Sequence, residues 1–223
     1  MDQNQDPFAI LSAALATSGL RILHSGAPAD EWPINRNIQS VLIIGHAGSE
    51  FWPYFKDSPE FSDGDLDPLD RWSARVIKAA APNMFFVSPS DGPPYAPIHE
   101  LAEGGSMHPS PLGMLAHAEF GLWIAIRGLL LTTESLPRSR PTNPIDPDSF
   151  IECFNACPVN AFSNNSFDAG SCANHLINNE TAECWSGCSA RKACTVGSDW
   201  IYEDTHAKFY MDAFTSAMQK RKI

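Results

Sequence analysis

Leu112–Thr132 reads LGMLAHAEFGLWIAIRGLLLT, and it carries the most information about the architecture of this chain. Its hydrophobic pattern predicts two strands around a turn near residues 118–121. The second strand alternates between two faces, one with Leu122, Ile124 and Ile126 and the other with Trp123, Ala125 and Arg127. We therefore expect a strand that packs its aliphatic face into a core and leaves Arg127 on the opposite face.

Further strands and helices are predicted on both sides of this stretch. Short apolar segments rich in β-branched or aromatic residues predict strands at Ser40–Gly45 and Asn83–Ser88. Helices are predicted at three places, from Asp6 to Gly19, from Asp67 to Pro82 and from Glu203 to Arg221. The first two start at an Asp-Pro pair, because aspartate caps a helix and proline fits its first turn. This mixture predicts an α+β fold.

Segments rich in proline separate these elements. Ser88–Pro111 holds six prolines and three glycines, which predicts a loop. Leu136–Pro147 holds four prolines and few apolar residues, which predicts a linker. We therefore expect an α+β domain at residues 1–147 and a separate segment at 148–223, with little regular structure before its C-terminal helix.

Composition narrows the class of protein. Of the 223 residues, 43% are apolar, enough for a packed core, and the longest apolar run falls short of the roughly 18 residues that span a bilayer. The N-terminus carries acids rather than the basic residues of a signal peptide. We therefore expect a cytoplasmic protein and exclude membrane-spanning and secreted ones.

The charge is strongly acidic. The chain has 15 Lys and Arg against 26 Asp and Glu, a formal net charge of −11. Because such a surface repels phosphate backbones and anionic lipids, we expect no nucleic-acid partner and no membrane partner. Between Glu50 and Asp70 seven acids meet one base, Lys56. A solvated loop is the simpler interpretation of this acidic stretch, and a cation site is the alternative.

All six cysteines lie in the last third of the chain: Cys153, Cys157, Cys172, Cys184, Cys188 and Cys194. In a reducing compartment, clustered cysteines bind metals or do redox work more often than they form structural disulfides. The cysteine segment is therefore the first place to look for a functional site.

The cysteine spacing is that of an incomplete two-cluster ferredoxin. Such a protein needs two runs of C-x2-C-x2-C-x3-C-P. Cys153 and Cys157-Pro158 end one run, but Pro147 and Phe150 hold its first two cysteine positions, and Arg191 holds a cysteine position in the other run. Two standard clusters are thus excluded.

One cluster can still be held. By the ferredoxin pattern Cys157, Cys172 and Cys188 would converge, with Cys184 or Cys194 as the fourth thiolate. Cys153 and Cys194 would then form a dithiol or a disulfide. Two alternatives stay open: three pairs of thiols or disulfides that only stabilise the tail, or a zinc site, although the chain lacks CxxC pairs.

The central stretch also resembles a known family pattern. His117, Phe120-Gly121, Trp123, Ala125 and Arg127 follow the order H-P-x-[FY]-G-x-W-x-A-x-R of epoxyqueuosine reductases and cblC-type cobalamin-processing proteins, with Ala118 in place of the proline. The helix start at Asp67-Pro68-Leu69-Asp70 is similar to theirs, and the cysteine tail resembles that of the reductases.

The resemblance implies a nitroreductase-like antiparallel sheet with helices at residues 1–147 and a ferredoxin-like tail at 148–223. It implies a corrinoid bound near His117, Gly121, Trp123 and Arg127, and one iron–sulfur cluster, of the [4Fe–4S] type, on Cys157, Cys172, Cys184 and Cys188. The resemblance therefore implies a redox protein that receives electrons from a donor protein. If the protein is an enzyme, it would be an oxidoreductase. The catalytic residue and the substrate stay undefined.

Three alternatives accompany this interpretation. The chain could be a non-catalytic electron carrier or cofactor-trafficking module, or a protein whose cysteines are only structural. His117 and Trp123 could be ordinary core residues. Arg127 needs an anionic partner because an unpaired guanidinium is costly to bury, and an internal acid such as Glu119 or one of the Glu50–Asp70 acids would serve as well as a ligand.

Overall fold

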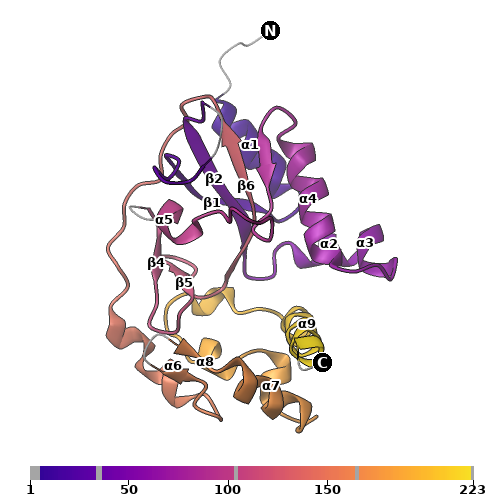
Figure 1. Ribbon diagram of the computed structural model, residues 1–223. Helices are drawn as coiled ribbons and strands as arrows, with labels where there is room; N and C mark the ends of the chain where they lie inside the picture. Colours follow the sequence, from indigo (N-terminus) through magenta and orange to yellow (C-terminus); the bar gives the residue numbers. More distant parts are fainter. Residues whose placement is uncertain (1–5, 34–36, 103–104, 164–165, 222–223) are drawn as a thin grey trace. The chain divides into compact units, whose positions relative to one another are not determined.

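The structure is a computed structural model, and it describes residues 6–33, 37–102, 105–163 and 166–221. The chain forms two compact units, which we describe separately (Figure 1). Unit 1 comprises Met1–Met107 and Ile124–Thr142, and unit 2 comprises His108–Trp123 and Asn143–Ile223. The division between residues 147 and 148 stays a prediction.

Unit 1 is built on a four-stranded antiparallel sheet with the strand order β1-β2-β6-β3. Its strands are β1 (Arg21–Gly26), β2 (Ser40–Ala47), β3 (Phe85–Val87) and β6 (Ile124–Thr132), and its helices are α1 (Pro7–Ala16), α2 (Trp52–Lys56), α3 (Pro59–Ser62), α4 (Pro68–Ala80) and α5 (Ile98–Ala102). Every residue of β2 is buried, as suits a central strand. Helix α4 packs against β6 and β3, and α1 packs against β1. The predicted α+β class is confirmed.

Local signals account for the helix starts of unit 1 only in part. The Asp6 carboxylate accepts a hydrogen bond from the Phe8 amide at 3.0 Å, the expected cap of α1. Asp67, before α4, instead adopts a left-handed backbone with φ of 51°, and its carboxylate makes no capping hydrogen bond with any described residue. Proline at the first position starts α4 there.

A β-bulge changes the direction of Arg127. In the β2–β6 ladder Ile44 lies opposite Gly128 and Gly45 lies opposite Ile126, so Arg127 is the extra residue. Bulges re-aim a side chain and break the alternation of a strand. The strict alternation predicted for residues 122–127 therefore fails at Arg127.

Unit 2 consists of short elements apart from its last helix, which has 18 residues. Its strands are β4 (Met107–Pro109), β5 (Leu115–His117), β7 (Phe162–Ser163) and β8 (Ser166–Phe167); its α-helices are α6 (Ile151–Asn155), α7 (Ala169–Ile177), α8 (Ser189–Lys192) and α9 (Asp204–Arg221); and its 3-10 helices are Pro147–Phe150, Glu183–Ser186 and Ser198–Trp200. Leu112, Ala116 and Leu122 share a buried core with Phe150 and Cys153, which ties the segment 108–123 to the cysteine segment.

Several expectations are corrected here. The stretch at residues 112–132 does form two strands, but β5 pairs with β4 whereas β6 pairs with β2 and β3, so they belong to different sheets. The predicted loop at residues 88–111 contains α5 and β4, and the cysteine segment has more helix than expected. Strand β1 was not predicted, because RILHSG shows weak alternation.

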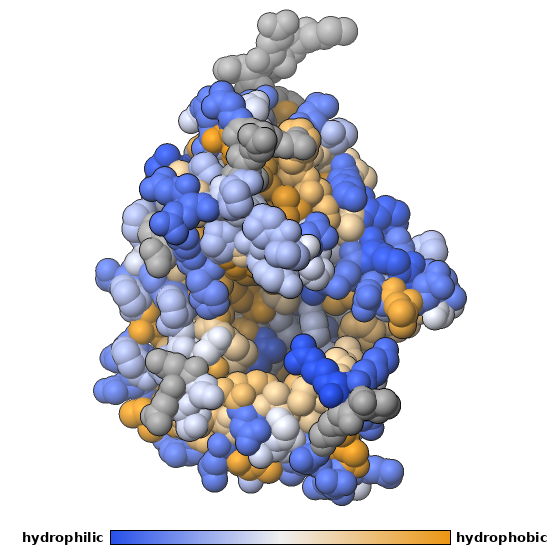
Figure 2. Space-filling model, in the orientation of Figure 1, coloured by the Kyte–Doolittle hydropathy of each residue, from blue (hydrophilic) through white to orange (hydrophobic). Residues whose placement is uncertain are grey.

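The acidic stretch Glu50–Asp70 is structured rather than a free loop. It contains α2, α3 and the start of α4, and hydrophilic residues predominate on the surface of this region in Figure 2. Arginines pair with several of its acids: Arg21 with Glu50, Arg71 with Asp63, Arg75 with Glu60 and Arg127 with Asp70. None of the described helices is both long and apolar enough to cross a bilayer.

Candidate functional site

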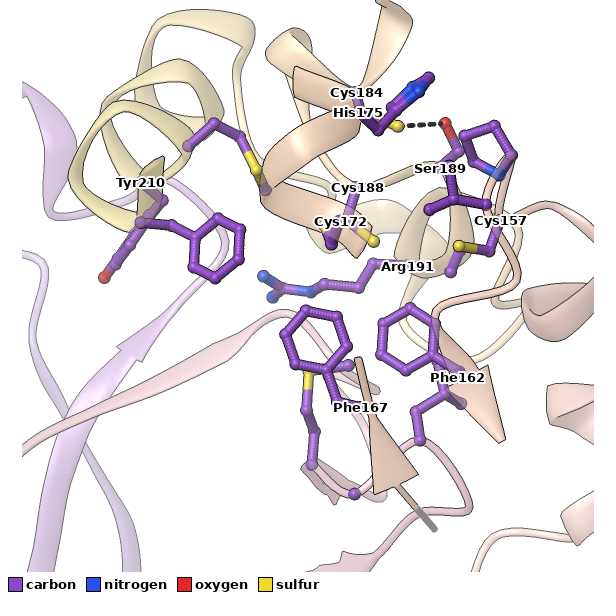
Figure 3. A pocket seen from close by; sticks show the side chains of 18 residues that line it. Cys157, Phe162, Phe167, Cys172, His175, Cys184, Cys188, Ser189, Arg191 and Tyr210 are labelled. Atoms are coloured by element: carbon purple, nitrogen blue, oxygen red, sulfur yellow. Dashed lines mark hydrogen bonds between the residues drawn. The ribbon is translucent and has the colours of Figure 1, made fainter. Parts of the chain in front are cut away.

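A pocket of about 480 Å³ lies inside unit 2 (Figure 3). Its walls are mainly apolar, with Met114, Val159, Phe162, Phe167 and Phe214 among them. Cavities of this size that combine an apolar wall with a few polar groups are the usual form of ligand and cofactor sites. This pocket is the candidate site.

All four cysteines that were predicted to hold a metal line this pocket. Cys157 follows α6, Cys172 lies in the first turns of α7, Cys184 lies in the 3-10 helix Glu183–Ser186, and Cys188 precedes α8. Asp168 fixes the start of α7, because its carboxylate accepts a hydrogen bond from the Ser171 amide at 2.9 Å. The structure thus brings the four thiols to one cavity, and their role as ligands stays a prediction.

Two of the cysteine sulfurs have hydrogen-bond partners of the kind that surround metal-bound thiolates. The Ala161 amide donates to the Cys157 Sγ at 3.2 Å, and the Cys184 Sγ and Ser189 Oγ are 3.3 Å apart. Burial raises the pKa of Cys172 to about 12, with the neighbouring thiols adding to the effect, and burial also raises the pKa of Cys188. These two thiols are therefore protonated at neutral pH and must lose a proton to bind a metal.

The arrangement is not that of a mononuclear metal site. Within the described ranges, no three His, Cys, Asp or Glu side chains are placed to hold one metal ion. Around one zinc ion at Zn–S distances of about 2.3 Å, four sulfurs would lie about 3.8 Å apart. In a [4Fe–4S] cluster each thiolate binds a different iron, so its four sulfurs surround a larger space.

Cys153 and Cys194 form a separate pair in the core of unit 2. Their exposed fractions are 0% and 2%. A hydrogen bond between the two thiols raises the pKa of Cys153 and lowers that of Cys194, because the protonated sulfur donates to its partner. The structure thus brings together the two residues that were predicted as a redox pair or alternative ligands, and both have free thiols.

Arg191, which occupies a cysteine position of the ferredoxin pattern, lines the pocket. Figure 3 shows its side chain extending between Cys172 and Cys188 on one side and the rings of Phe162 and Phe167 on the other. Its guanidinium carbon lies 4.6 Å from the ring centre of Trp123 and 4.7 Å from that of Tyr202. Stacking of this kind contributes on the order of 1–2 kcal/mol where water is excluded.

Arg191 has hydrogen-bonding capacity to spare. One Nη atom donates to the Leu122 carbonyl oxygen. Its Nε is shielded from solvent and has no hydrogen-bond partner in the described part of the chain, and the same part offers it no ion pair. The cysteine spacing pointed to Arg191, but nothing in the sequence predicted its aromatic partners.

Two of the residues predicted to bind a corrinoid have packing roles in unit 2. The His117 ring stacks on Phe120 at 4.3 Å between centroids, and its Nδ1 accepts a hydrogen bond from the Glu119 amide at 3.1 Å. Gly121 has φ of +55°, and the backbone of Val196 approaches it so closely that a side chain would collide with it. Both help to form the turn that follows β5.

The other two also make internal contacts. Trp123 is 1% exposed and packs edge-on against Tyr202 at 5.1 Å. Arg127, in unit 1, forms an ion pair with Asp70, and its Nε donates to the Ser73 Oγ at 3.3 Å. Asp70 is one of the acids considered as its internal partner. Corrinoid binding by these four residues stays a prediction.

Some pocket residues had no signal in the sequence analysis. His175 and Met211 line the pocket together with Tyr210. Tyr210 falls within the helix predicted from Glu203 to Arg221, and nothing in its spacing pointed to the cysteines. The approach of α9 to α7, which brings Tyr210 there, is a long-range contact that local patterns do not encode.

Comparisons with known proteins identify the fold. No protein-family model matches the chain, and no curated protein sequence matches it significantly. The crystal structure of the B12-trafficking protein CblC from C. elegans is similar, with 12% identity, a TM-score of 0.51 and coverage of 94% of both chains.

Two epoxyqueuosine reductase structures also match. One is a selenomethionine-labelled crystal form, with 15% identity, a TM-score of 0.43 and coverage of 78% of this chain and 53% of the reductase. The other holds an epoxyqueuosine-modified tRNA-Tyr stem loop, with the same identity and TM-score and coverage of 78% and 52%. The chain thus spans about half the length of these reductases. The CblC structure confirms, at the level of the fold, the resemblance predicted from the sequence.

Proposed function

We propose that this chain is a redox protein that holds one iron–sulfur cluster in the pocket of unit 2. The observation that supports the proposal is that Cys157, Cys172, Cys184 and Cys188 all line this one cavity. Four thiolates are the ligand set of a [4Fe–4S] cluster, which carries one electron at a time. The ferredoxin-like character of residues 148–223 is part of this proposal.

The surroundings of the thiols suit this cofactor. Phe162, Phe167 and Phe214 would keep water from it, and solvent exposure and hydrogen bonds to the sulfurs are two of the factors that set a cluster's potential. The Ala161 amide already donates to the Cys157 sulfur. These residues would hold the cofactor and shield it, while electrons arrive from a donor protein.

The proposed small molecule that exchanges electrons with this site is a corrinoid. The support is the likeness, over 94% of both chains, to a protein described as trafficking vitamin B12. Whether the chain then acts as an oxidoreductase or as a trafficking module depends on turnover. We propose no nucleic-acid partner, in keeping with the net charge of −11.

Anaerobic reconstitution with ferrous iron and sulfide tests the cluster. The wild type should acquire about four irons per chain and a broad brown absorbance. Cys157→Ala and Cys172→Ala should each lose most of both, because each removes a ligand from the pocket. Cys153→Ala is the matched control, since it removes a buried thiol from the core pair instead, and it should keep the cluster.

If Cys153→Ala and Cys157→Ala lose equal amounts of iron and absorbance, the proposed ligand set is wrong. Zinc in place of iron in the purified protein would favour the mononuclear alternative. Titration of the same samples with cobalamin, followed through the corrin bands, tests the small-molecule part separately, and unchanged bands would refute it.

A further inference from the structure

We infer that Arg191 is the counter-charge for an anionic cofactor in the cysteine pocket and that it raises the reduction potential of that cofactor. The inference rests on the proposed function, because it takes the cofactor to be an iron–sulfur cluster on the pocket thiols. It goes further by assigning a role to a residue that stands where the ferredoxin pattern has a cysteine.

The first support is that Arg191 has lost the usual partners of a shielded arginine. Among the ion pairs of the described residues, four arginines have a carboxylate partner and Arg191 does not. Its Nε is shielded from solvent and is without a hydrogen-bond acceptor in the parts of the chain that are described. Arg191 as a whole is half-buried, and an anion beside it would complete the surroundings of this shielded nitrogen.

The second support is the direction from which an anion can come. The Arg191 side chain lines the same cavity as the four thiols and passes beside Cys172 and Cys188 (Figure 3). The guanidinium also packs against the rings of Trp123 and Tyr202, neither of which lines the pocket. The pocket is therefore the open side.

The rings also fix where the charge sits. Trp123 is 1% and Tyr202 4% exposed, so the half-buried Arg191 stacks on rings that are themselves closely packed. Arginine stays charged at any working pH, and its planar head is held by stacking in a way that lysine cannot copy. A fixed positive charge in a region of low dielectric interacts strongly with any change of charge in the pocket.

One-electron reduction of the proposed cluster would change the charge in the pocket. A low-potential one-electron donor gives one electron to the bound cluster; no bond is formed or broken, and the pocket gains one negative charge. At a separation on the order of 10 Å and an effective dielectric constant of about 20, a unit charge changes such an equilibrium about tenfold. Tenfold corresponds to about 59 mV for a one-electron couple. Arg191 should therefore favour the reduced state by roughly this amount.

The test is a dithionite titration of the reconstituted protein, monitored by absorbance and by the electron paramagnetic resonance of the reduced cluster. Arg191→Gln and Arg191→Met remove the charge, and both should lower the potential by about 59 mV. Arg191→Lys keeps the charge without the stacking, so it should keep most of the potential while it lowers the melting temperature. Lys208→Gln is the control, because Lys208 is an exposed cation of the same unit paired with Asp212.

The outcomes separate this inference from the proposed function. If the wild type takes up no iron, the proposed function fails. If the wild type binds a cluster and both neutral variants bind it with an unchanged potential, Arg191 is only a structural residue and the inference is wrong. A shift in Lys208→Gln as large as in Arg191→Gln would also overturn it, because the effect would then come from overall charge. If neither neutral variant folds, a wild-type potential retained in Arg191→Lys supports the role of the charge, and a potential lowered by about 59 mV in that variant overturns it.

Discussion

In unit 1 four arginines lie against carboxylates, whereas in unit 2 Arg191 lies against two adjoining aromatic rings and lines a pocket with four thiols. The buried Glu60, for example, pairs with Arg75 at 2.9 Å, and this ion pair holds the pKa of Glu60 down to about 2. Unit 1 thus pairs these four arginines with its own acids. Unit 2 instead has an arginine and four thiols that line a cavity, the arrangement that the proposed cofactor site requires.

The largest expected effect concerns the core of unit 1. Trp72 is 2% exposed and packs against Phe51 at 5.7 Å and Phe55 at 5.6 Å between ring centroids. Trp72→Ala should lower the free energy of unfolding by about 3–5 kcal/mol, because it leaves a large cavity. Hydrogen exchange in peptides of unit 1, followed against denaturant, measures this loss, and a cost below about 1 kcal/mol would contradict the packing described.

The next largest effect is a dependence of the stability of unit 2 on pH. Burial, with a contribution from the Arg191 charge, lowers the pKa of His206 from 6.5 to about 3. The tyrosines Tyr202 and Tyr210 pack on its ring. Because the unfolded chain takes up a proton at higher pH than the folded one, stability is full above pH 6.5 and falls as the pH approaches 3.

Between pH 7 and pH 4.5 the contribution of His206 to the free energy of unfolding of unit 2 falls by about 2–3 kcal/mol. His206→Phe removes the titrating group and should flatten the unfolding free energy of unit 2 over this range. His24 in unit 1 also has a lowered pKa, so the difference between the wild type and the variant is the quantity to measure. Parallel curves for the two proteins would rule out this account of His206.

A pair of glycines, one in each unit, gives a smaller effect. Gly121 has φ of +55° and a Cβ there would collide with the Val196 carbonyl, whereas Gly64 in unit 1 has φ of +78° and open space around it. Gly121→Ala should cost about 2–3 kcal/mol, through strain and the collision, and Gly64→Ala only about 1 kcal/mol, through strain. Thermal unfolding of both variants tests whether the close approach in unit 2 is real, and equal costs would argue against it.

The smallest effect is expected at Arg127. Its side chain is 12% exposed, but that of its partner Asp70 is 50% exposed, so solvent weakens the pair. Arg127→Gln and Asp70→Asn should show a coupling energy of about 1 kcal/mol in a double-mutant cycle. If Arg127→Gln instead abolishes cobalamin binding without changing stability, the arginine is a ligand-binding residue.

The sequence predicted most reliably what local patterns determine. Asp6-Pro7 marks the start of α1, and the apolar segment at Ser40–Gly45 becomes the centre of β2. Strand β1 and helix α5 were missed, because an irregular polar strand and a helix within a proline-rich segment leave weak local signals. Contacts between residues that are distant in the sequence determine whether β1 and α5 form.

The same distinction applies to the candidate site. Cysteine spacing pointed to Cys157, Cys172, Cys184 and Cys188 as one group, and the structure places them around one pocket. The stack of Arg191 on Trp123 and Tyr202 could not be predicted, since it joins residues that are far apart along the chain. Arg127 was expected to require an anionic partner. The bulge at Arg127 and the choice of Asp70 as its partner are seen only in the structure.

The way the chain alternates between its units has a consequence for synthesis on the ribosome. The segment 108–123 belongs to unit 2 but is followed by β6, the strand that completes the sheet of unit 1. At roughly 5–20 residues per second, the partners of Leu112 and Leu122 near Cys194 emerge several seconds after unit 1 can close at Thr142. During that interval the nascent chain displays an apolar segment with nothing yet made to cover it, so this stretch is where a chaperone would be needed first.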